Sequence, residues 1–188
     1  MYDPQGMMNW AVQMCGRSDV GYSQTYRNYQ THNGITYFDC SSFTFFAMWL
    51  GGGLDVGALG YSTNLSDYQN GLANAWVVSS MVSKLQALGW SQVSASDYTQ
   101  WLPGDILVKT RTHTEILYTQ NPLQCMGARN SSLPLADQVA IHACPTTYYD
   151  QVWRDPNSPP PTPPGPRIHG PMPAWLLKHG AQIGGRFY

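Results

Sequence analysis

The sequence predicts an α+β domain in which helices precede an antiparallel sheet of about five strands. Two patterns lead to this class. The first half of the 188 residues contains three segments with helical signals, and the part after Pro103-Gly104 consists of short extended runs separated by turn residues. A composition of 43% hydrophobic and 13% aromatic residues is that of a folded chain with a sizeable core.

The helical signals occur at residues 4–16, 42–50 and 79–89. In the first segment apolar side chains recur at i, i+3, i+4 and i+7 from Met7, the stripe of an amphipathic helix. The second segment is apolar on every side and stops at Gly51-Gly52-Gly53, which predicts a helix surrounded by protein. The third begins with serine residues that can cap a helix and ends in glycine.

The predicted strands follow one another with turn residues between them. They cover residues 105–110, 113–119, 124–128, 138–144 and 148–154. The stretch DPNSPPPTPPGP then places seven prolines in twelve residues, which predicts a stiff linker over residues 155–166. We therefore expect a domain over residues 1–154. The tail at 167–188 is too short to hold a core of its own and is expected to dock elsewhere or stay mobile.

Charge and hydropathy exclude several classes of protein. Ten Lys and Arg against eleven Asp and Glu leave a net charge of -1, so a nucleic-acid partner is not expected. No stretch approaches the roughly 20 apolar residues of a membrane span. The first residues lack the features of a signal peptide, which predicts synthesis in the cytoplasm. The cysteines have no CxxC spacing, and we favour free thiols over a disulfide between Cys125 and Cys144.

Cys40 is the candidate nucleophile. It stands in the segment FDCSSF, between Asp39 and two serines and directly before the apolar helix. A thiolate at a helix N-terminus is stabilised by free backbone N–H groups and by the helix dipole. A buried cysteine of the core is the alternative, but it would not need this polar setting.

A cysteine hydrolase also needs an imidazole and a polar group that orients it. Among the five histidines, only His113 and His142 lie inside predicted strands. In the strand at 113–119, His113 and Glu115 share one face, and Glu115 is the only glutamate in the chain. These three side chains could alternatively bind zinc, but no HExxH spacing supports a metal, and we expect no metal and no other cofactor.

Six segments, in this order and spacing, carry a family resemblance. They are VGYSQTYR (20–27), FDCSSF (38–43), LQALGW (85–90), LPGDIL (102–107), HTEILY (113–118) and MGARNSSLPLADQVAI (126–141). The sequence resembles the NlpC-type papain-like cell-wall peptidases, more closely their bacteriophage relatives, the amidase-type endolysins, and more distantly the CHAP domains. The resemblance covers roughly residues 20–154 and implies a papain-like fold.

The resemblance implies roles for individual residues. Cys40 matches the nucleophile and His113 the general base. Tyr22 matches a tyrosine near the oxyanion, with Tyr37 as a competitor for that place. Asp39, beside the nucleophile, is a further candidate for contact with the oxyanion or the substrate.

The residue that orients His113 stays open among three candidates. The resemblance suggests His142, in an Ile-His-Ala motif, or Glu115, with Asn130 behind them. Residues i and i+2 of a strand lie about 6.5 to 7 Å apart at their Cα atoms, whereas cross-strand partners stand roughly 4.5 to 5.5 Å apart. This geometry favours a cross-strand partner: His142 if its strand neighbours that of His113, and Asn130 or a neighbour if residues 124–128 do.

The function implied by the resemblance is hydrolysis of an amide bond in peptidoglycan. The bond could join muramic acid to L-alanine or lie within the stem or the cross-bridge. The protein would be a phage endolysin or a hydrolase carried in the virion, made in the host cytoplasm and acting on the cell wall. Its tail could bind phage tail proteins. The alternatives are a non-catalytic wall-binding or virion structural module and an acyltransferase that uses the same residues.

Overall fold

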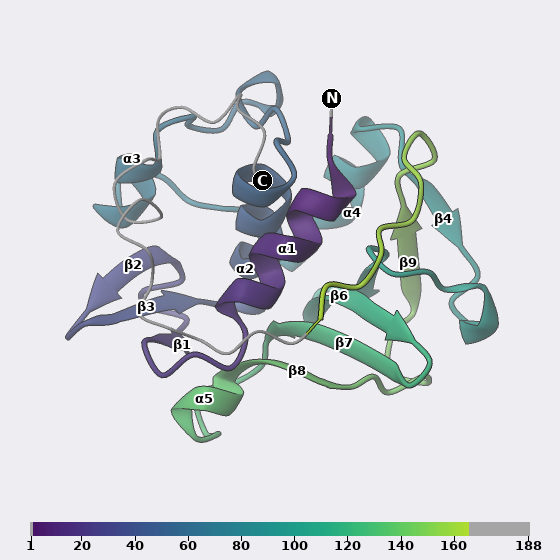
Figure 1. Ribbon diagram of the computed structural model, residues 1–188. Coiled ribbons are helices and arrows are strands. Elements are labelled where there is room, and N and C mark those ends of the chain that lie inside the picture. The colour runs from purple at the N-terminus through teal and green to yellow at the C-terminus, as the bar shows by residue number, and fades with distance from the viewer. Residues whose placement is uncertain (1, 166–188) are drawn as a thin grey trace.

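The computed structural model describes residues 2–165 and has the predicted α+β class (Figure 1). Its α-helices are α1 (Pro4–Met14), α2 (Cys40–Phe46), α3 (Leu65–Gln69), α4 (Val78–Ala87) and α5 (Leu135–Gln138). Three further helical segments, of π or 3-10 geometry, are η1 (Ala47–Gly51), η2 (Gly57–Leu59) and η3 (Tyr98–Gln100). Among residues 2–165, no helix combines the length and the apolar character that crossing a membrane requires.

The strands form two sheets on either side of α1 (Figure 1). The smaller sheet has the order β1-β3-β2, from β1 (Val20–Tyr22), β2 (Asn28–His32) and β3 (Ile35–Phe38). The larger sheet has the order β4-β9-β5-β6-β7-β8 and is antiparallel throughout. Its strands are β4 (Ser91–Val93), β5 (Ile106–Lys109), β6 (His113–Gln120), β7 (Leu123–Ala128), β8 (Val139–Ala143) and β9 (Gln151–Arg154).

Helix α1 forms where the apolar stripe predicts it. Asp3 caps its start by accepting a hydrogen bond from the Gln5 backbone N–H at 3.0 Å, and Pro4 occupies the first turn. The helix packs closely on η1, because a Cβ at Gly6 would lie 2.3 Å from the Gly51 carbonyl oxygen. Two facing glycines therefore bring the N-terminal helix against the helix that carries Cys40.

The second predicted helix begins two residues earlier than expected, at Cys40, and its last turns form the π-helix η1. Asp39 and Ser42 make a capping box: the Asp39 carboxylate accepts from the Ser42 backbone N–H at 2.7 Å, and the Ser42 hydroxyl accepts from the Asp39 N–H at 2.9 Å. This cap explains the polar residues around Cys40. Every side chain of α2 is buried, as the apolar run predicted.

The two faces of the six-stranded sheet bury different clusters. Ile106 and Val108 of β5 belong to the main core with α1 and α2, whereas Leu107 between them belongs to a second cluster on the opposite face. This alternation is the period of two expected of a strand. The second cluster also contains Trp101 and Tyr149, from loops that cover this face.

The prediction of about five strands was incomplete. The main sheet has a sixth strand, β4, and the three-stranded sheet was not predicted. It lies between α1 and α2 in the chain, so strands do not simply follow helices. The missed strands have three to five residues, too few for a clear alternation. The Asn33-Gly34 turn between β2 and β3, in which both residues have positive φ, is the signal that could have identified them.

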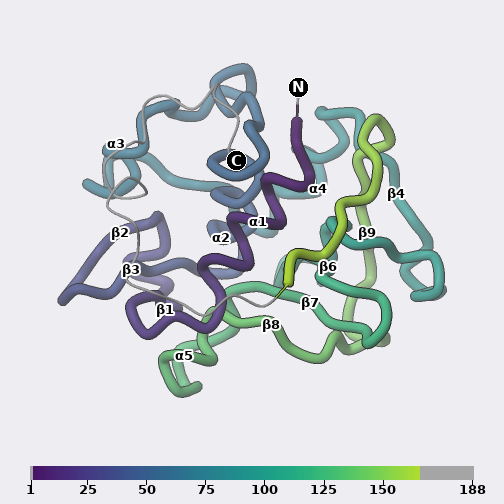
Figure 2. The backbone as a smooth tube through the Cα atoms, in the orientation of Figure 1, coloured from purple at the N-terminus to yellow at the C-terminus, as the bar shows by residue number. Residues whose placement is uncertain are grey.

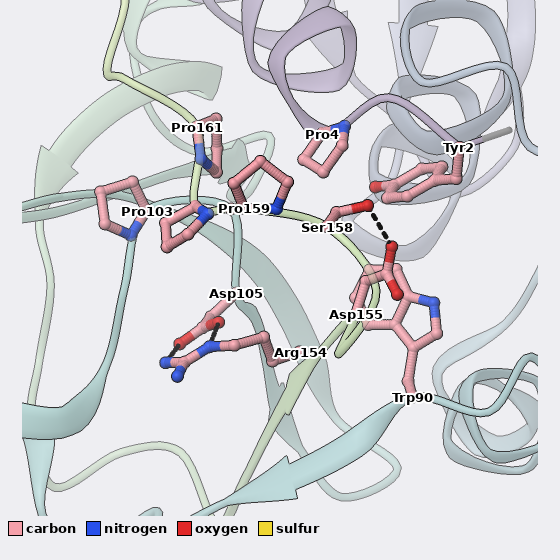
Figure 3. Close-up of a pocket in the computed structure, with 12 residues that line it drawn as sticks. Tyr2, Pro4, Trp90, Pro103, Asp105, Arg154, Asp155, Ser158, Pro159 and Pro161 are labelled. Atoms are coloured by element: carbon pink, nitrogen blue, oxygen red, sulfur yellow. Dashed lines mark hydrogen bonds and ion pairs between the residues drawn. The ribbon is translucent and has the colours of Figure 1, made fainter.

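The proline-rich segment lies on the body of the domain over its described residues, 155–165. It runs beside α1 as the yellow end of the trace (Figure 2). Gln5 donates to the Thr162 carbonyl oxygen at 3.0 Å and accepts from its backbone N–H at 2.8 Å. Figure 3 shows Pro159 and Pro161 near Pro4 and Pro103, above the ion pair of Asp105 and Arg154. The predicted tail, 167–188, lies outside the described residues.

Candidate active site

Cys40 is the first residue of α2, and its side chain is 5% exposed. Cys40 also lies close enough to His113, the first residue of β6, to raise the pKa of its ring. The neighbouring Asp39 carboxylate accepts from the Arg27 Nε at 2.6 Å in addition to capping the helix. Asp39 was predicted to contact the oxyanion or the substrate. In the structure, its carboxylate instead caps α2 and binds Arg27.

His113 lies between Cys40 and a carboxylate. Its Nε2 is 3.1 Å from Glu115 Oε1. Burial lowers the pKa of His113, but hydrogen bonds with Cys40 and Glu115 and the negative charge of both groups outweigh burial and raise the pKa to about 10. The ring is therefore held as an imidazolium beside the thiol at neutral pH.

Glu115 is 1% exposed, and four side chains surround its carboxylate. His142 Nε2 lies 2.8 Å from Oε1, which His113 also contacts. Tyr149 donates its hydroxyl proton to Oε2, and the Cys125 thiol lies 2.7 Å from the same oxygen. Burial raises the pKa of Glu115, but hydrogen bonds from the two histidines and their positive charge bring it well below its usual range.

Gly127 makes this arrangement possible. It stands on β7, between β6 with Glu115 and β8 with His142. A Cβ at position 127 would lie 2.8 Å from Glu115 Cγ and 3.3 Å from Oε1. Because no side chain occupies this place, the Glu115 side chain can extend over β7 and meet His142.

His142 is held in its charged form by acceptors at both ring nitrogens. Nε2 faces Glu115, and Nδ1 lies 2.9 Å from the Ala143 carbonyl oxygen. Only an imidazolium can donate from both nitrogens. Burial lowers the pKa of His142, but hydrogen bonds with Cys125 and Glu115 and the charge of Glu115 raise it to about 10.

The other two donors to Glu115 keep their protons. Hydrogen bonding with Cys144, followed by burial, raises the pKa of the Cys125 thiol, and both cysteines are free. Burial and the charge of Glu115 raise the pKa of the Tyr149 hydroxyl. Sequence analysis did not identify Cys125 or Tyr149 as members of the site, because their positions show no pattern until the strands are paired.

The structure brings Glu115, and not Asn130, to the His113 ring. Strand β7, and not β8, neighbours β6, which made Asn130 the expected partner. Asn130 is instead exposed in the loop after β7, where it accepts a hydrogen bond from the Ser132 backbone N–H at 2.9 Å. His142 contacts Glu115 from the other side, so it acts on His113 through the shared carboxylate.

Of the two predicted tyrosines, Tyr22 lies near Cys40. It ends β1, and burial raises the pKa of its hydroxyl, with a smaller contribution from the charge of Cys40. Tyr37 stands on the neighbouring strand β3, and its ring packs on Tyr26 at a centroid distance of 5.8 Å. This placement favours Tyr22 as the neighbour of a reacting carbonyl group at Cys40.

An open cavity of about 260 Å³ adjoins Cys40. Its lining includes Cys40, Ser41, Val77 and Val78, and also Arg111 from the turn between β5 and β6. Arg111 has a φ of 62°, a left-handed conformation that destabilises a non-glycine residue by about 1 to 2 kcal/mol. Sequence analysis did not single out Arg111.

One set of side chains has the composition of a metal site. Ligand atoms of Glu115, Cys125 and His142 lie within 4.8 Å of one another, and carboxylate, thiolate and imidazole are ligands of zinc. The set differs from the predicted alternative, because Cys125 takes the place of His113. Both oxygens of Glu115 already accept hydrogen bonds, so a metal ion would have to displace them.

Comparisons with known proteins place the chain in no family: no family model matches the sequence, and no curated protein does.

Proposed function

We propose that the protein is a cysteine hydrolase that cleaves an amide bond of peptidoglycan. We further propose that its fold is papain-like and related to NlpC-type peptidases and phage amidase-type endolysins. One observation carries the proposal: Cys40 stands at a helix N-terminus, close enough to His113 to raise the pKa of its ring, and the same ring contacts the buried Glu115. Nucleophile, base and orienting group therefore follow one another in space, as cysteine hydrolysis requires.

The proposed reaction starts from a Cys40 thiolate and a His113 imidazolium. The thiolate attacks the amide carbonyl carbon, and the Cys40 backbone N–H and Tyr22 stabilise the oxyanion. His113 then protonates the amine nitrogen as the carbon–nitrogen bond breaks. Water, deprotonated by His113, hydrolyses the thioester and releases the acid, which restores the ion pair. Glu115 keeps the ring charged and oriented throughout.

The biological setting that we propose is a bacteriophage. The protein would be made in the host cytoplasm and act on the wall as an endolysin, or it would be carried in the virion to open the wall on entry. In the second case, residues 167–188 would attach it to phage tail proteins. Both settings use the same chemistry at Cys40.

The decisive experiment is digestion of purified cell walls by the wild type and by Cys40→Ser, followed by mass spectrometry of the released fragments. Serine is close to cysteine in volume but does not ionise readily, so Cys40→Ser should fold and release no fragments. Cys15→Ala, which removes a buried thiol elsewhere, is the control and should release them. The mass of the wild-type fragments would identify the amide that is cut.

Three results would contradict the proposal. Release of fragments by Cys40→Ser at the wild-type rate would exclude the thiol mechanism. Wall binding without any release by the wild type would indicate the non-catalytic module, and products joined to an added amine would indicate an acyltransferase.

A further inference from the structure

Arg111 lies where it can contact a substrate bound at Cys40. It stands in the turn between β5 and β6, two residues before His113, and both Arg111 and Cys40 line the open cavity. Its side chain is exposed. Arg111 and Cys40 therefore border the same cavity.

The left-handed conformation of Arg111 belongs to the turn between β5 and β6, and it is unfavourable for an arginine. Among the described residues, three non-glycine residues have positive φ: Tyr29, Asn33 and Arg111. Tyr29 stands at a strand irregularity that directs its ring into the core, and Asn33 belongs to an Asn-Gly turn. A glycine would suit the turn at position 111 better than arginine. Strain of this kind gathers at functional sites, where the side chain is needed.

The charge of Arg111 is not balanced by the protein. Within residues 2–165, the structure gives its guanidinium no ion pair. The other arginine at the cavity, Arg27, is occupied: it contacts Asp39 at 2.6 Å, Ser41 at 3.0 Å and the Trp76 carbonyl oxygen. The lining thus has two arginines and a single carboxylate, that of Asp39.

We propose that Arg111 binds a carboxylate of the substrate, close to the amide that Cys40 attacks. The inference rests on the proposed function and defines its substrate class as wall peptides with a free carboxylate, in preference to those in which this group is amidated. A guanidinium group suits this task, because its planar N–H groups can donate two parallel hydrogen bonds to one carboxylate.

The binding test uses Cys40→Ser, which holds the substrate uncleaved, and two synthetic wall peptides that differ only in a carboxylate or a carboxamide. Calorimetry should show up to about fivefold tighter binding of the carboxylate peptide, the upper end of what a solvent-exposed ion pair contributes. The preference should weaken as NaCl is added. It should vanish in Cys40→Ser/Arg111→Gln. Lys109→Gln removes a cation of the same hairpin that is paired with Asp150 and does not line the cavity, so this control should keep the preference.

A kinetic test on the active enzyme measures the ratio of kcat/KM for the two peptides. Arg111→Gln should bring the ratio to about one, and Arg111→Lys should retain part of it. Arg111→Gly should show the same loss together with an unfolding temperature equal to or above that of the wild type, because glycine relieves the strained backbone.

The outcomes separate this inference from the proposed function. If the wild type cleaves both peptides with equal kcat/KM, the amide hydrolase stands and the carboxylate site is excluded. If it cleaves neither, the proposed function fails, and the binding test still decides the role of Arg111. If Arg111→Gly is less stable than the wild type and still prefers the carboxylate peptide, Arg111 stabilises the turn and does not bind the substrate.

Discussion

His113 and Glu115 lie two residues apart on strand β6, and their side chains meet, with His113 Nε2 3.1 Å from Glu115 Oε1. Cα atoms at this spacing are about 6.5 to 7 Å apart, so both side chains must lean toward one another. Glu115 can do so because donors from other segments hold its carboxylate and because Gly127 leaves space over β7. Glu115, a neighbour on the same strand, is thus the carboxylate that contacts the His113 ring.

Replacing Glu115 by glutamine should move the basic limb of the pH–rate profile. The carboxylate stabilises the protonated His113 ring and helps to raise its pKa to about 10. Without this charge the imidazolium loses its proton at lower pH, and the active ion pair is lost earlier as pH rises. The profile of kcat/KM against pH for Glu115→Gln should therefore fall at lower pH than that of the wild type. An unmoved basic limb would show that Glu115 does not set the charge of His113.

Replacing His142 by alanine should not move the basic limb of the pH–rate profile to lower pH, in contrast to Glu115→Gln. His142 carries a positive charge that shares Glu115 Oε1 with His113. Its removal leaves Glu115 Oε1 to His113 alone, which favours the charged ring and moves the basic limb to higher pH or leaves it in place. The maximum rate should fall, since Glu115 loses a donor that fixes it. A downward shift equal to that of Glu115→Gln would make His142 an independent partner of His113.

The hydrogen bond from the Tyr149 hydroxyl to Glu115 should stabilise the folded protein. Tyr149→Phe removes a donor from a buried carboxylate, and a hydrogen bond to a charged group contributes roughly 1.5 to 3 kcal/mol. The free energy of unfolding, measured in urea, should fall by about this amount. Tyr148→Phe is the matched control, because the neighbouring tyrosine is 38% exposed. Equal stability of the two variants would contradict the role of Tyr149.

Adding one methyl group at Gly127 should disturb the site. In Gly127→Ala the new Cβ would lie 2.8 Å from Glu115 Cγ, too close for either group to keep its place. Overpacking of this kind destabilises proteins by about 1 to 3 kcal/mol. Because the displaced group orients His113, kcat/KM should fall as well. Unfolding in urea and kinetics on the same preparation would measure both effects, and wild-type values in both would refute the steric argument.

Metal chelators should leave the activity unchanged. In the proposed reaction Glu115 acts through hydrogen bonds to its two oxygens, and a metal ion at Glu115, Cys125 and His142 would have to displace them. Activity measured after dialysis against EDTA should equal that of the untreated protein. Loss of activity that added zinc restores would instead make these three side chains a metal site.

The sequence by itself identified the features that depend on neighbours in the chain. The apolar stripe of α1 and the apolar run of α2 are local patterns. So is the strand that carries both His113 and Glu115, which appeared as a run of alternating character. Helix periodicity, capping and strand alternation are properties of successive residues, so they can be seen before the chain is folded.

Only the tertiary structure decided which side chains meet. Cys125, His142 and Tyr149 come from a strand, another strand and a loop, and they converge on Glu115 through the pairing of β6, β7 and β8. The position of Arg111 also depends on the tertiary structure, because only the folded chain brings its turn and Cys40 to the same cavity. Register and strand order depend on contacts between residues far apart in the chain. Packing between distant parts of the chain therefore brings a buried carboxylate and its donors together, and no local pattern of residues predicts this arrangement.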